Sequence, residues 1–182
     1  MGALQKEQYY SYQEWLKLDL GKDTRSELID GEIYLLASAS TRHQSIAGEM
    51  FRQLSTFLHG KKCKPFWGLD VRLEDDTVVI PDLLVVCDPT KLTDSGCNGA
   101  PDLIVEILSP STAKYDRLTK FLLYQRVGVP EYWIVDPLDN IVTIHKLTEN
   151  GYLTTIFTDT DTVTINALPG FEMDLSTVFS QE

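Results

Sequence analysis

The sequence lacks the features of a membrane protein, a disulfide scaffold or a chain of several domains. Its longest apolar runs, such as residues 83–87, are far shorter than the roughly 20 residues of a membrane helix. The three cysteines, Cys63, Cys87 and Cys97, form no C-x-x-C pair, so we expect three plain thiols and neither a disulfide framework nor a zinc ribbon. No internal repeat or Pro/Gly/Ser-rich linker divides the chain, which predicts a single domain over residues 1–182.

Basic residues are also scarce. The chain has 16 Lys and Arg against 27 Asp and Glu, which gives a formal net charge of −11. This charge excludes the diffuse polybasic surface of a general nucleic-acid coating protein, so any contact with nucleic acid is local or assisted by cations. Residues 1–6 have neither the pattern of a signal peptide nor that of a myristoylation signal. We therefore expect a cytoplasmic protein that does not contact a membrane.

The N-terminal part of the chain carries two clear local signals and one long periodic segment. Residues 11–14 match a capping box, which predicts that a short helix starts there. The Asp30-Gly31 pair tolerates the positive φ angles of a type I′ turn and predicts a tight hairpin. Apolar residues at helical spacing predict a helix of about five turns over residues 41–58, with Gly60 as its left-handed cap.

The rest of the chain alternates strand and helix signals. Residues 78–86 and 102–108 are apolar on both faces, which predicts two strands in the centre of a sheet covered on both sides. A helix over residues 114–127 and a strand over 131–136 follow. Short antiparallel strands are expected at 141–147, 152–157 and 162–165. The predicted fold is an α/β domain with a mixed central sheet flanked by helices, and with extra antiparallel strands at the C-terminal side.

Two carboxylates lie in these apolar strands. Asp82 follows Pro81, and Glu106 is the only charged residue between Leu103 and Leu108. An unpaired carboxylate among aliphatic side chains costs several kcal/mol at least, so each needs a cation, hydrogen-bond donors or a raised pKa. Either one alone is explained by a salt bridge at a strand end. Together, on successive strands, they can direct oxygens to one point, as a hard divalent cation such as Mg²⁺ requires.

The helix after the second strand carries a cation on one face. Asp116 and Lys120 are four residues apart, with Tyr124 a further turn along. One interpretation is an exposed ion pair worth a few tenths of a kcal/mol. The other is that Lys120 faces Glu106, where an ammonium group can orient water and stabilise charge on phosphate oxygens. Lys114, at the start of the helix, is the alternative lysine.

Several of these segments together resemble a known family. They are residues 79–82, 100–112, 116–120 and 128–137, joined by the hairpin of residues 27–32 and by Arg42-His43. This pattern is similar to the Uma-type family of endonucleases, within the restriction-endonuclease-like PD-(D/E)xK superfamily. The resemblance covers residues 12–179. It implies a mixed sheet flanked by helices, a divalent metal such as Mg²⁺ or Mn²⁺, and hydrolysis of phosphodiester bonds in DNA.

The resemblance also implies roles for individual residues. Asp82 and Glu106 correspond to the two acidic motif residues that hold the metal. The superfamily pattern places a lysine two residues after the second acid, where this chain has Leu108. The family resemblance suggests that Lys120 replaces it from the following helix. Glu27 resembles the additional acidic residue of many superfamily members, although a solvated strand-edge glutamate is equally consistent with its position.

Two further features leave alternatives open. His43 lies on the apolar face of the predicted helix, which favours a core or boundary histidine over a ligand. The absence of a lysine at position 108 and the acidic composition are also typical of a nuclease fold that binds or assembles without catalysis. Superfamily resemblance further implies a homodimer. We expect its interface in an exposed apolar patch of the C-terminal segment, made of Leu168, Phe171, Met173, Val178 and Phe179.

Overall fold

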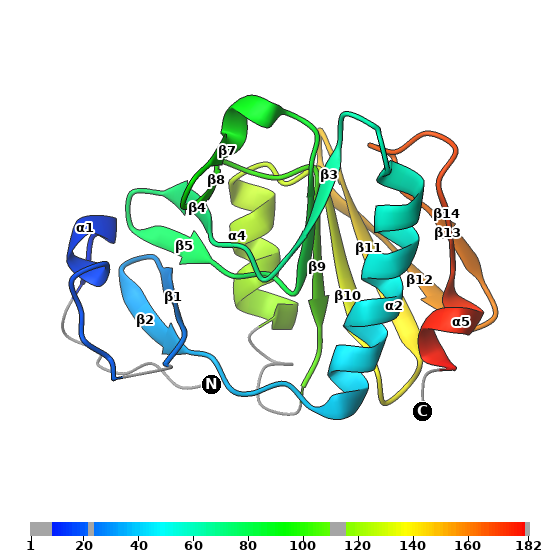
Figure 1. The fold of residues 1–182 in the computed structure, drawn as a ribbon, viewed down its shortest axis with the longest axis horizontal. Coiled ribbons are helices and arrows are strands. Elements are labelled where there is room, and N and C mark those ends of the chain that lie inside the picture. The colour runs from blue at the N-terminus through cyan, green and yellow to red at the C-terminus, as the bar shows by residue number, and fades with distance from the viewer. Residues whose placement is uncertain (1–8, 22–23, 110–115, 181–182) are drawn as a thin grey trace.

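The structure of the protein is a computed structural model, which describes residues 9–21, 24–109 and 116–180. Two six-stranded sheets and a two-stranded sheet make up its β-structure (Figure 1). The central sheet has the order β12 (Gly151–Thr158), β11 (Ile141–Thr148), β10 (Glu131–Asp136), β9 (Leu103–Ile107), β6 (Leu83–Val86) and β3 (Lys64–Trp67). The second sheet has the order β2 (Glu32–Leu35), β1 (Ser26–Ile29), β5 (Thr77–Val79), β4 (Val71–Glu74), β8 (Gly96–Asn98) and β7 (Leu92–Thr93). The small sheet pairs β13 (Thr162–Thr164) with β14 (Glu172–Asp174).

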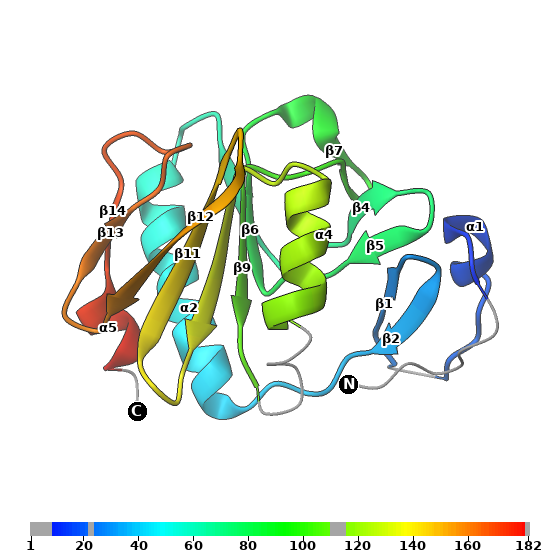
Figure 2. The same ribbon diagram turned by 180° about the vertical axis from the view of Figure 1, so that it is seen from behind.

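The helical segments of the described residues are α1 (Tyr12–Trp15), α2 (Thr41–Leu58), the 3-10 helix η1 (Pro89–Lys91), the π-helical segment η2 (Asp116–Lys120), α4 (Phe121–Arg126) and α5 (Leu175–Phe179). Two of them cover the central sheet. Helix α2 covers one face and α4 covers the other (Figures 1 and 2). Strands β9 and β10 are parallel, whereas their neighbours pair antiparallel. The mixed sheet flanked by helices is therefore confirmed, and β11 and β12 are the predicted C-terminal additions.

Local signals in the N-terminal part predicted its elements correctly. Ser11 and Glu14 form the complete capping box of α1. Asp30 and Gly31 have φ angles of 48° and 76°, as the turn between β1 and β2 requires. Helix α2 spans the predicted residues, and Ser40 caps its N-terminus by accepting a hydrogen bond from the backbone N–H of His43.

The predicted strand at residues 78–86 was wrong in one respect, because it is two strands in different sheets. Strand β5 ends at Val79 in the second sheet, and β6 begins at Leu83 in the central sheet. Pro81 has no N–H for a ladder, and the N–H of Ile80 is donated to Glu27 Oε1 instead of a neighbouring strand. The chain therefore changes sheets between residues 79 and 83, and Asp82 lies at the junction.

The predicted C-terminal apolar patch is also wrong. Its five residues, Leu168, Phe171, Met173, Val178 and Phe179, are all buried. They pack in one core with the inner face of α2, including Met50 and Leu54, and with the central sheet. The buried face of α2 needs apolar side chains around it. The central sheet supplies some of them, and β13, β14, α5 and the residues between them supply others. The interface that we expected for a homodimer therefore does not exist at this position.

One cysteine prediction was wrong as well. Cys63 and Cys87 form a disulfide, and Cys97 is a buried free thiol. The two half-cystines flank the paired strands β3 and β6, where Lys64 lies opposite Val86. Strand pairing, invisible in the spacing along the chain, brings them together. Among the described residues, no helix is both long and apolar enough to cross a bilayer.

Candidate active site

Asp82 occupies the point where β6 begins and the ladder with β9 ends. The last ladder pair is Leu83 with Val105. One residue further on, the Asp82 carboxylate replaces a ladder carbonyl, because its Oδ2 accepts the backbone N–H of Ile107 at 2.8 Å. His43 Nε2, from the first turn of α2, lies 3.0 Å from the same oxygen. Two contacts thus fix one carboxylate oxygen of a side chain that remains 25% exposed.

Glu106 lies inside the protein, on the face of β9 that is turned toward α4. Strand alternation turns Val105 and Ile107 toward α2 and turns Ile104 and Glu106 toward α4. On α4 and the turn before it, Lys120 and Tyr124 are one helical turn apart and face the sheet. Lys120 Nζ donates to Glu106 Oε1 at 2.8 Å, and Tyr124 OH donates to the same oxygen at 2.8 Å. Lys120 and Tyr124 therefore face Glu106, as the second interpretation of this helix expected.

Glu27 joins this cluster from the second sheet. In β1, alternation puts Glu27 on the same side as Ile29, which packs in the core beneath α4. Glu27 Oε1 accepts Lys120 Nζ at 2.9 Å and the backbone N–H of Ile80 at 2.8 Å. Glu27 is fully buried, so the interpretation as a solvated strand-edge residue is wrong. Lys120 is 3% exposed, so its amine lies inside the protein and not on the solvent-exposed face of the helix.

Burial controls the electrostatics of the cluster. Two carboxylates and one ammonium group lie together away from water, and Glu27 Oε2 is buried without a hydrogen-bond partner. Burial, and next the charge of Glu106, raise the pKa of the Tyr124 hydroxyl well above its usual value. Tyr124 is therefore a neutral donor at physiological pH. A buried cluster of two carboxylates and one ammonium group needs a further positive charge or a proton to compensate the second carboxylate.

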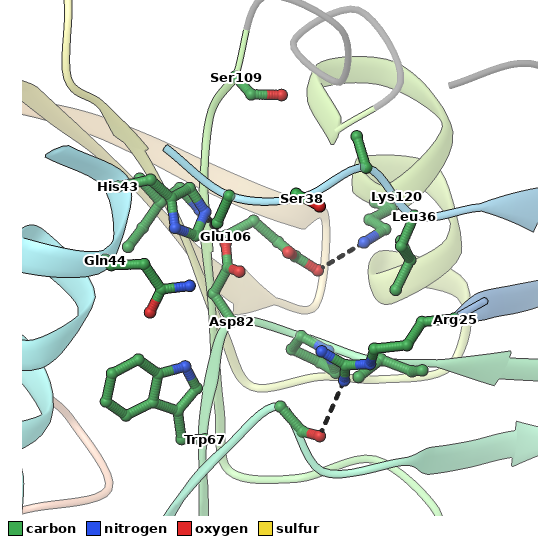
Figure 3. Close-up of a pocket in the computed structure, with 16 residues that line it drawn as sticks. Arg25, Leu36, Ser38, His43, Gln44, Trp67, Asp82, Glu106, Ser109 and Lys120 are labelled. Atoms are coloured by element: carbon green, nitrogen blue, oxygen red, sulfur yellow. Dashed lines mark hydrogen bonds and ion pairs between the residues drawn. The ribbon is translucent and has the colours of Figure 1, made fainter. Parts of the chain in front are cut away.

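Asp82, Glu106, Lys120 and His43 line one cavity of about 240 Å³ (Figure 3). The cavity lies between the start of α2, the junction before β6 and the start of α4. Arg25, Gln44 and Trp67 line its remaining walls. The structure thus brings Asp82, Glu106 and Lys120, three of the four predicted site residues, to one cavity. The fourth, Glu27, does not line the cavity but binds Lys120. The alternative lysine, Lys114, lies outside the described residues.

Sequence reasoning missed two members of this group. His43 is buried as expected, but its ring binds Asp82, so it is part of the site as well as of the core boundary. Tyr124 was placed on the face of Lys120 without a role, and its hydroxyl contacts Glu106. The signal was present in both cases, because a polar group on an otherwise apolar helix face needs a buried partner.

A second group of acids does not belong to this site. Asp30, Glu74 and Asp76 are exposed and close enough to share a cation. However, Arg126 already pairs with Asp30 at 2.6 Å and with Glu74 at 2.7 Å. This group is a surface ion-pair network beside the hairpin turn.

The comparison with known proteins agrees with this architecture. A sequence profile of the Uma2 family, described as "Putative restriction endonuclease", matches residues 7–176. The chain belongs to the Uma2 family. Two uncharacterized proteins of Synechocystis sp. strain PCC 6803 are similar to this Uma2 protein. One, slr1290, is 28% identical over 145 residues, which are 78% of this chain and 76% of that protein. The other, sll1609, is 31% identical over 129 residues, or 68% and 72% of the two chains.

A solved structure shares the fold of this Uma2 protein. It is the crystal structure of "a putative nuclease belonging to DUF820" from Anabaena variabilis, with a TM-score of 0.79 and 21% sequence identity. The match covers 94% of this chain and 98% of the other. At this identity the likeness concerns the fold. It confirms that the two sheets and their helices form an α/β architecture that the two proteins share.

Proposed function

We propose that this Uma2 protein is a divalent-metal-dependent DNA endonuclease that hydrolyses phosphodiester bonds. One observation carries the proposal. Asp82, Glu106 and Lys120 come from separate segments of the chain, yet they line one cavity, and the Lys120 amine binds Glu106 directly. A lysine supplied by the helix after β9 can therefore serve in place of the lysine that is missing at Leu108.

Asp82 and Glu106 offer the cavity carboxylate oxygens, which are the ligands that a hard divalent cation such as Mg²⁺ or Mn²⁺ prefers. Asp82 Oδ2 is held by two contacts, while Oδ1 accepts no hydrogen bond from any described residue. Glu27 Oε2 is buried without a hydrogen-bond partner, and a nearby cation would compensate its charge. Asp82 and Glu106 would hold the ion, and Glu27 would support it. When bound, such an ion supplies Lewis-acid activation of water and neutralises phosphate charge.

The other residues of the site hold and orient these groups. The Lys120 ammonium would position the attacking water and stabilise the charge that develops on the phosphate oxygens. Tyr124 holds Glu106 Oε1 in place, and His43 holds Asp82 Oδ2. Because Lys120 also binds Glu27, its amine is fixed from two sides before substrate arrives, which is the preorganisation that this role requires.

A nicking assay tests the proposal. Supercoiled plasmid is incubated with purified protein and millimolar Mn²⁺, Mg²⁺ or EDTA, and the conversion to open-circular DNA is followed. We expect metal-dependent nicking by the wild type and none by Asp82→Asn. The control Arg52→Ala alters an exposed charge on α2, which among the described residues pairs with Glu49 alone, and should nick like the wild type. Equal nicking by wild type and Asp82→Asn would reject the assignment.

A second function is favoured by one specific observation. Leu108 is buried in the apolar core beneath α4, so the strand position of the usual lysine is occupied by packing. In a binding or assembly module, the Glu27–Lys120–Glu106 network would only join the two sheets. Such a module would bind DNA or a protein without cleaving, and the nicking assay separates it from the enzyme.

The proposal also concerns the binding partner, the oligomeric state and the cellular location of the protein. The partner is DNA, reached locally because the net charge is −11. The expected homodimer now depends on family resemblance alone, and light scattering tests it against the 20.6 kDa of one chain. We place the protein in the cytoplasm, where cellular reductants keep thiols reduced, so Cys63 and Cys87 would pair there only after oxidation.

A further inference from the structure

Part of the cavity lining is not used by the proposed catalytic residues, and we call this part the outer wall. Trp67 and Gln44 form it on one side of Asp82, and Arg25 forms it on the other (Figure 3). Their side chains are an aromatic ring, an amide and a guanidinium group. These are the groups that stack on a nucleobase, hydrogen-bond to its edge and bind phosphate.

Trp67 is a fixed and exposed ring at the rim of the cavity. It ends the edge strand β3, remains 46% exposed and packs against Phe51 of α2 with ring centroids 5.9 Å apart. The next residue, Gly68, donates its N–H to the carbonyl oxygen of Asp82 at 3.2 Å. The ring is thereby held beside the candidate metal ligand. Trp67 therefore offers an exposed aromatic ring at the cavity, on which a nucleobase can stack.

Arg25 approaches the same glycine from the other side. Its Nη2 donates to the carbonyl oxygen of Gly68 at 3.2 Å, and it forms no ion pair with any described residue. A Cβ at Gly68 would lie 3.3 Å from Nη2, and the φ angle of +56° disfavours other residues there. The Asp70 carboxylate lies near enough to interact with the Arg25 charge but forms no ion pair with it. Most of the five guanidinium N–H groups therefore remain available, and a phosphate is an anion that they suit.

Gln44 completes the outer wall from the first turn of α2. Its side chain is exposed, lines the cavity and makes no hydrogen bond with any described residue. An amide can donate and accept at once, which matches the edge of a base that has lost its Watson–Crick partner.

We propose that the outer wall binds one unpaired DNA nucleotide, with its base on Trp67, its base edge at Gln44 and a phosphate at Arg25. Substrates with single-stranded or unpaired nucleotides would then be preferred to regular duplex. The proposal rests on the proposed function for its choice of DNA. The base of an intact duplex cannot reach a ring at the cavity rim without leaving its stack, whereas a single strand offers every base.

Charge favours the same substrate. A duplex lays many phosphates along the surface of a protein with a net charge of −11, at a cost that grows with each phosphate. A single nucleotide in the cavity places one phosphate beside Arg25 and gains stacking on Trp67. The site thus obtains its binding energy from one aromatic and one ionic contact.

Binding without cleavage tests the inference. Fluorescence anisotropy in EDTA compares a labelled 15-nucleotide oligothymidine with a 15-base-pair duplex. We expect the wild type to bind the single strand more tightly, and Trp67→Ala to bind it about 5- to 150-fold more weakly. Arg25→Ala should lower the salt dependence of log K by about 0.7, and Arg52→Ala should match the wild type. Equal affinity of wild type and Trp67→Ala, or tighter binding of the duplex, would overturn the inference.

A second measurement does not depend on the folding of the alanine variant. Trp67 is the most exposed of the three tryptophans, since Trp133 is buried and Trp15 packs in a small core. Oligothymidine should therefore quench the tryptophan fluorescence of the wild type, and Trp67→Phe should remove most of this quenching. Quenching that persists in Trp67→Phe would contradict the proposed position of the base.

A cleavage assay separates this inference from the proposed function. Single-stranded, regular duplex and bulged duplex substrates are incubated with Mn²⁺ and wild type or Trp67→Phe. Equal cleavage of all three by both proteins would reject the inference and leave the endonuclease intact. No cleavage of any substrate, with Trp67-dependent binding of the single strand, would reject the endonuclease and support the nucleotide site.

Discussion

Lys120 Nζ lies 2.8 Å from Glu106 Oε1 in the interior of the protein, where both residues are less than 5% exposed. Fourteen positions separate them in the sequence, and Lys120 lies on the far side of the connection between β9 and α4. The amine reaches the face of β9 from a helix instead of from the strand itself. This geometry makes Lys120 both a candidate for catalysis and part of the link between the two sheets.

Replacing Lys120 should separate metal binding from hydrolysis. We expect Lys120→Ala to lower the nicking rate on the order of a hundredfold or more, because a group that stabilises transition-state charge is lost. The metal-induced rise in melting temperature should persist or increase. Because two buried carboxylates lose their shared cation, the free energy of unfolding should also fall by about 3–5 kcal/mol. Lys120→Met keeps most of the side-chain volume and is measured in place of the alanine variant if that variant does not fold.

Lys114→Ala is the comparison for this experiment and should change neither property. Nicking and thermal melting with and without Mn²⁺ are measured side by side for the three variants. A folded Lys120→Ala protein that nicks at the wild-type rate would show that Lys120 is not the replacement lysine.

Metal should stabilise the wild type through Asp82. An ion that binds only the native state raises the free energy of unfolding by about 2.7 kcal/mol at one hundred times its Kd. For a chain of this length each kcal/mol raises Tm by about 2–4 °C. Asp82→Asn should remove this increment in differential scanning fluorimetry. Asp76→Asn, in the exposed acid group, should keep it, and the reverse result would assign the ion to the surface network.

Tyr124→Phe should reduce activity through Glu106. The change removes one buried hydrogen bond to Oε1 and leaves the ring in place, so stability should fall by roughly 0.5–1.5 kcal/mol. The kcat for nicking should fall about tenfold with little change in KM, since a misoriented Glu106 affects the chemical step. Tyr152→Phe loses a similar hydrogen bond, to the carbonyl oxygen of Val129, and should leave kcat unchanged. Equal kcat values for both variants would leave Tyr124 with a structural role only.

Stability should fall between pH 6.5 and pH 4 because of His145. Burial lowers the pKa of this imidazole from 6.5 to about 4, so the unfolded chain takes up a proton in this range before the folded chain does. The loss amounts to about 3 kcal/mol over the range. Phe121, Tyr132 and Tyr152 surround the ring, so His145→Phe keeps an aromatic group there. In urea titrations at pH 7 and pH 4.5, the variant should lose less stability than the wild type. Parallel losses would contradict this assignment.

Reduction should destabilise the protein through the Cys63–Cys87 bond. The bond closes a loop with a sequence separation of 24, for which loop-closure entropy predicts about 3 kcal/mol. Denaturant titrations with and without dithiothreitol should show this difference for the wild type and for Cys97→Ser. Cys63→Ser should be insensitive to the reductant. Identical curves for the oxidised and reduced wild type would show that the pair is not bonded in solution.

The sequence alone determined the local elements and the identity of the principal side chains. The capping box at Ser11, the Asp30-Gly31 turn and the 41–58 helix each depend on neighbours within a few residues, which a sequence displays directly. Asp82 and Glu106 were identified for an equally local reason, because a charge inside an apolar strand requires a partner.

Only the tertiary structure decided how these pieces meet. The break at Pro81 sends β5 and β6 to different sheets, and no local pattern in residues 78–86 specifies which neighbour each half pairs with. Several other features join positions that are far apart in the chain. They are the burial of Glu27, the contacts of His43 and Tyr124, the Cys63–Cys87 bond and the packing of the C-terminal segment against α2. Such contacts depend on strand order and on which core has room for a side chain, and these are properties of the whole fold.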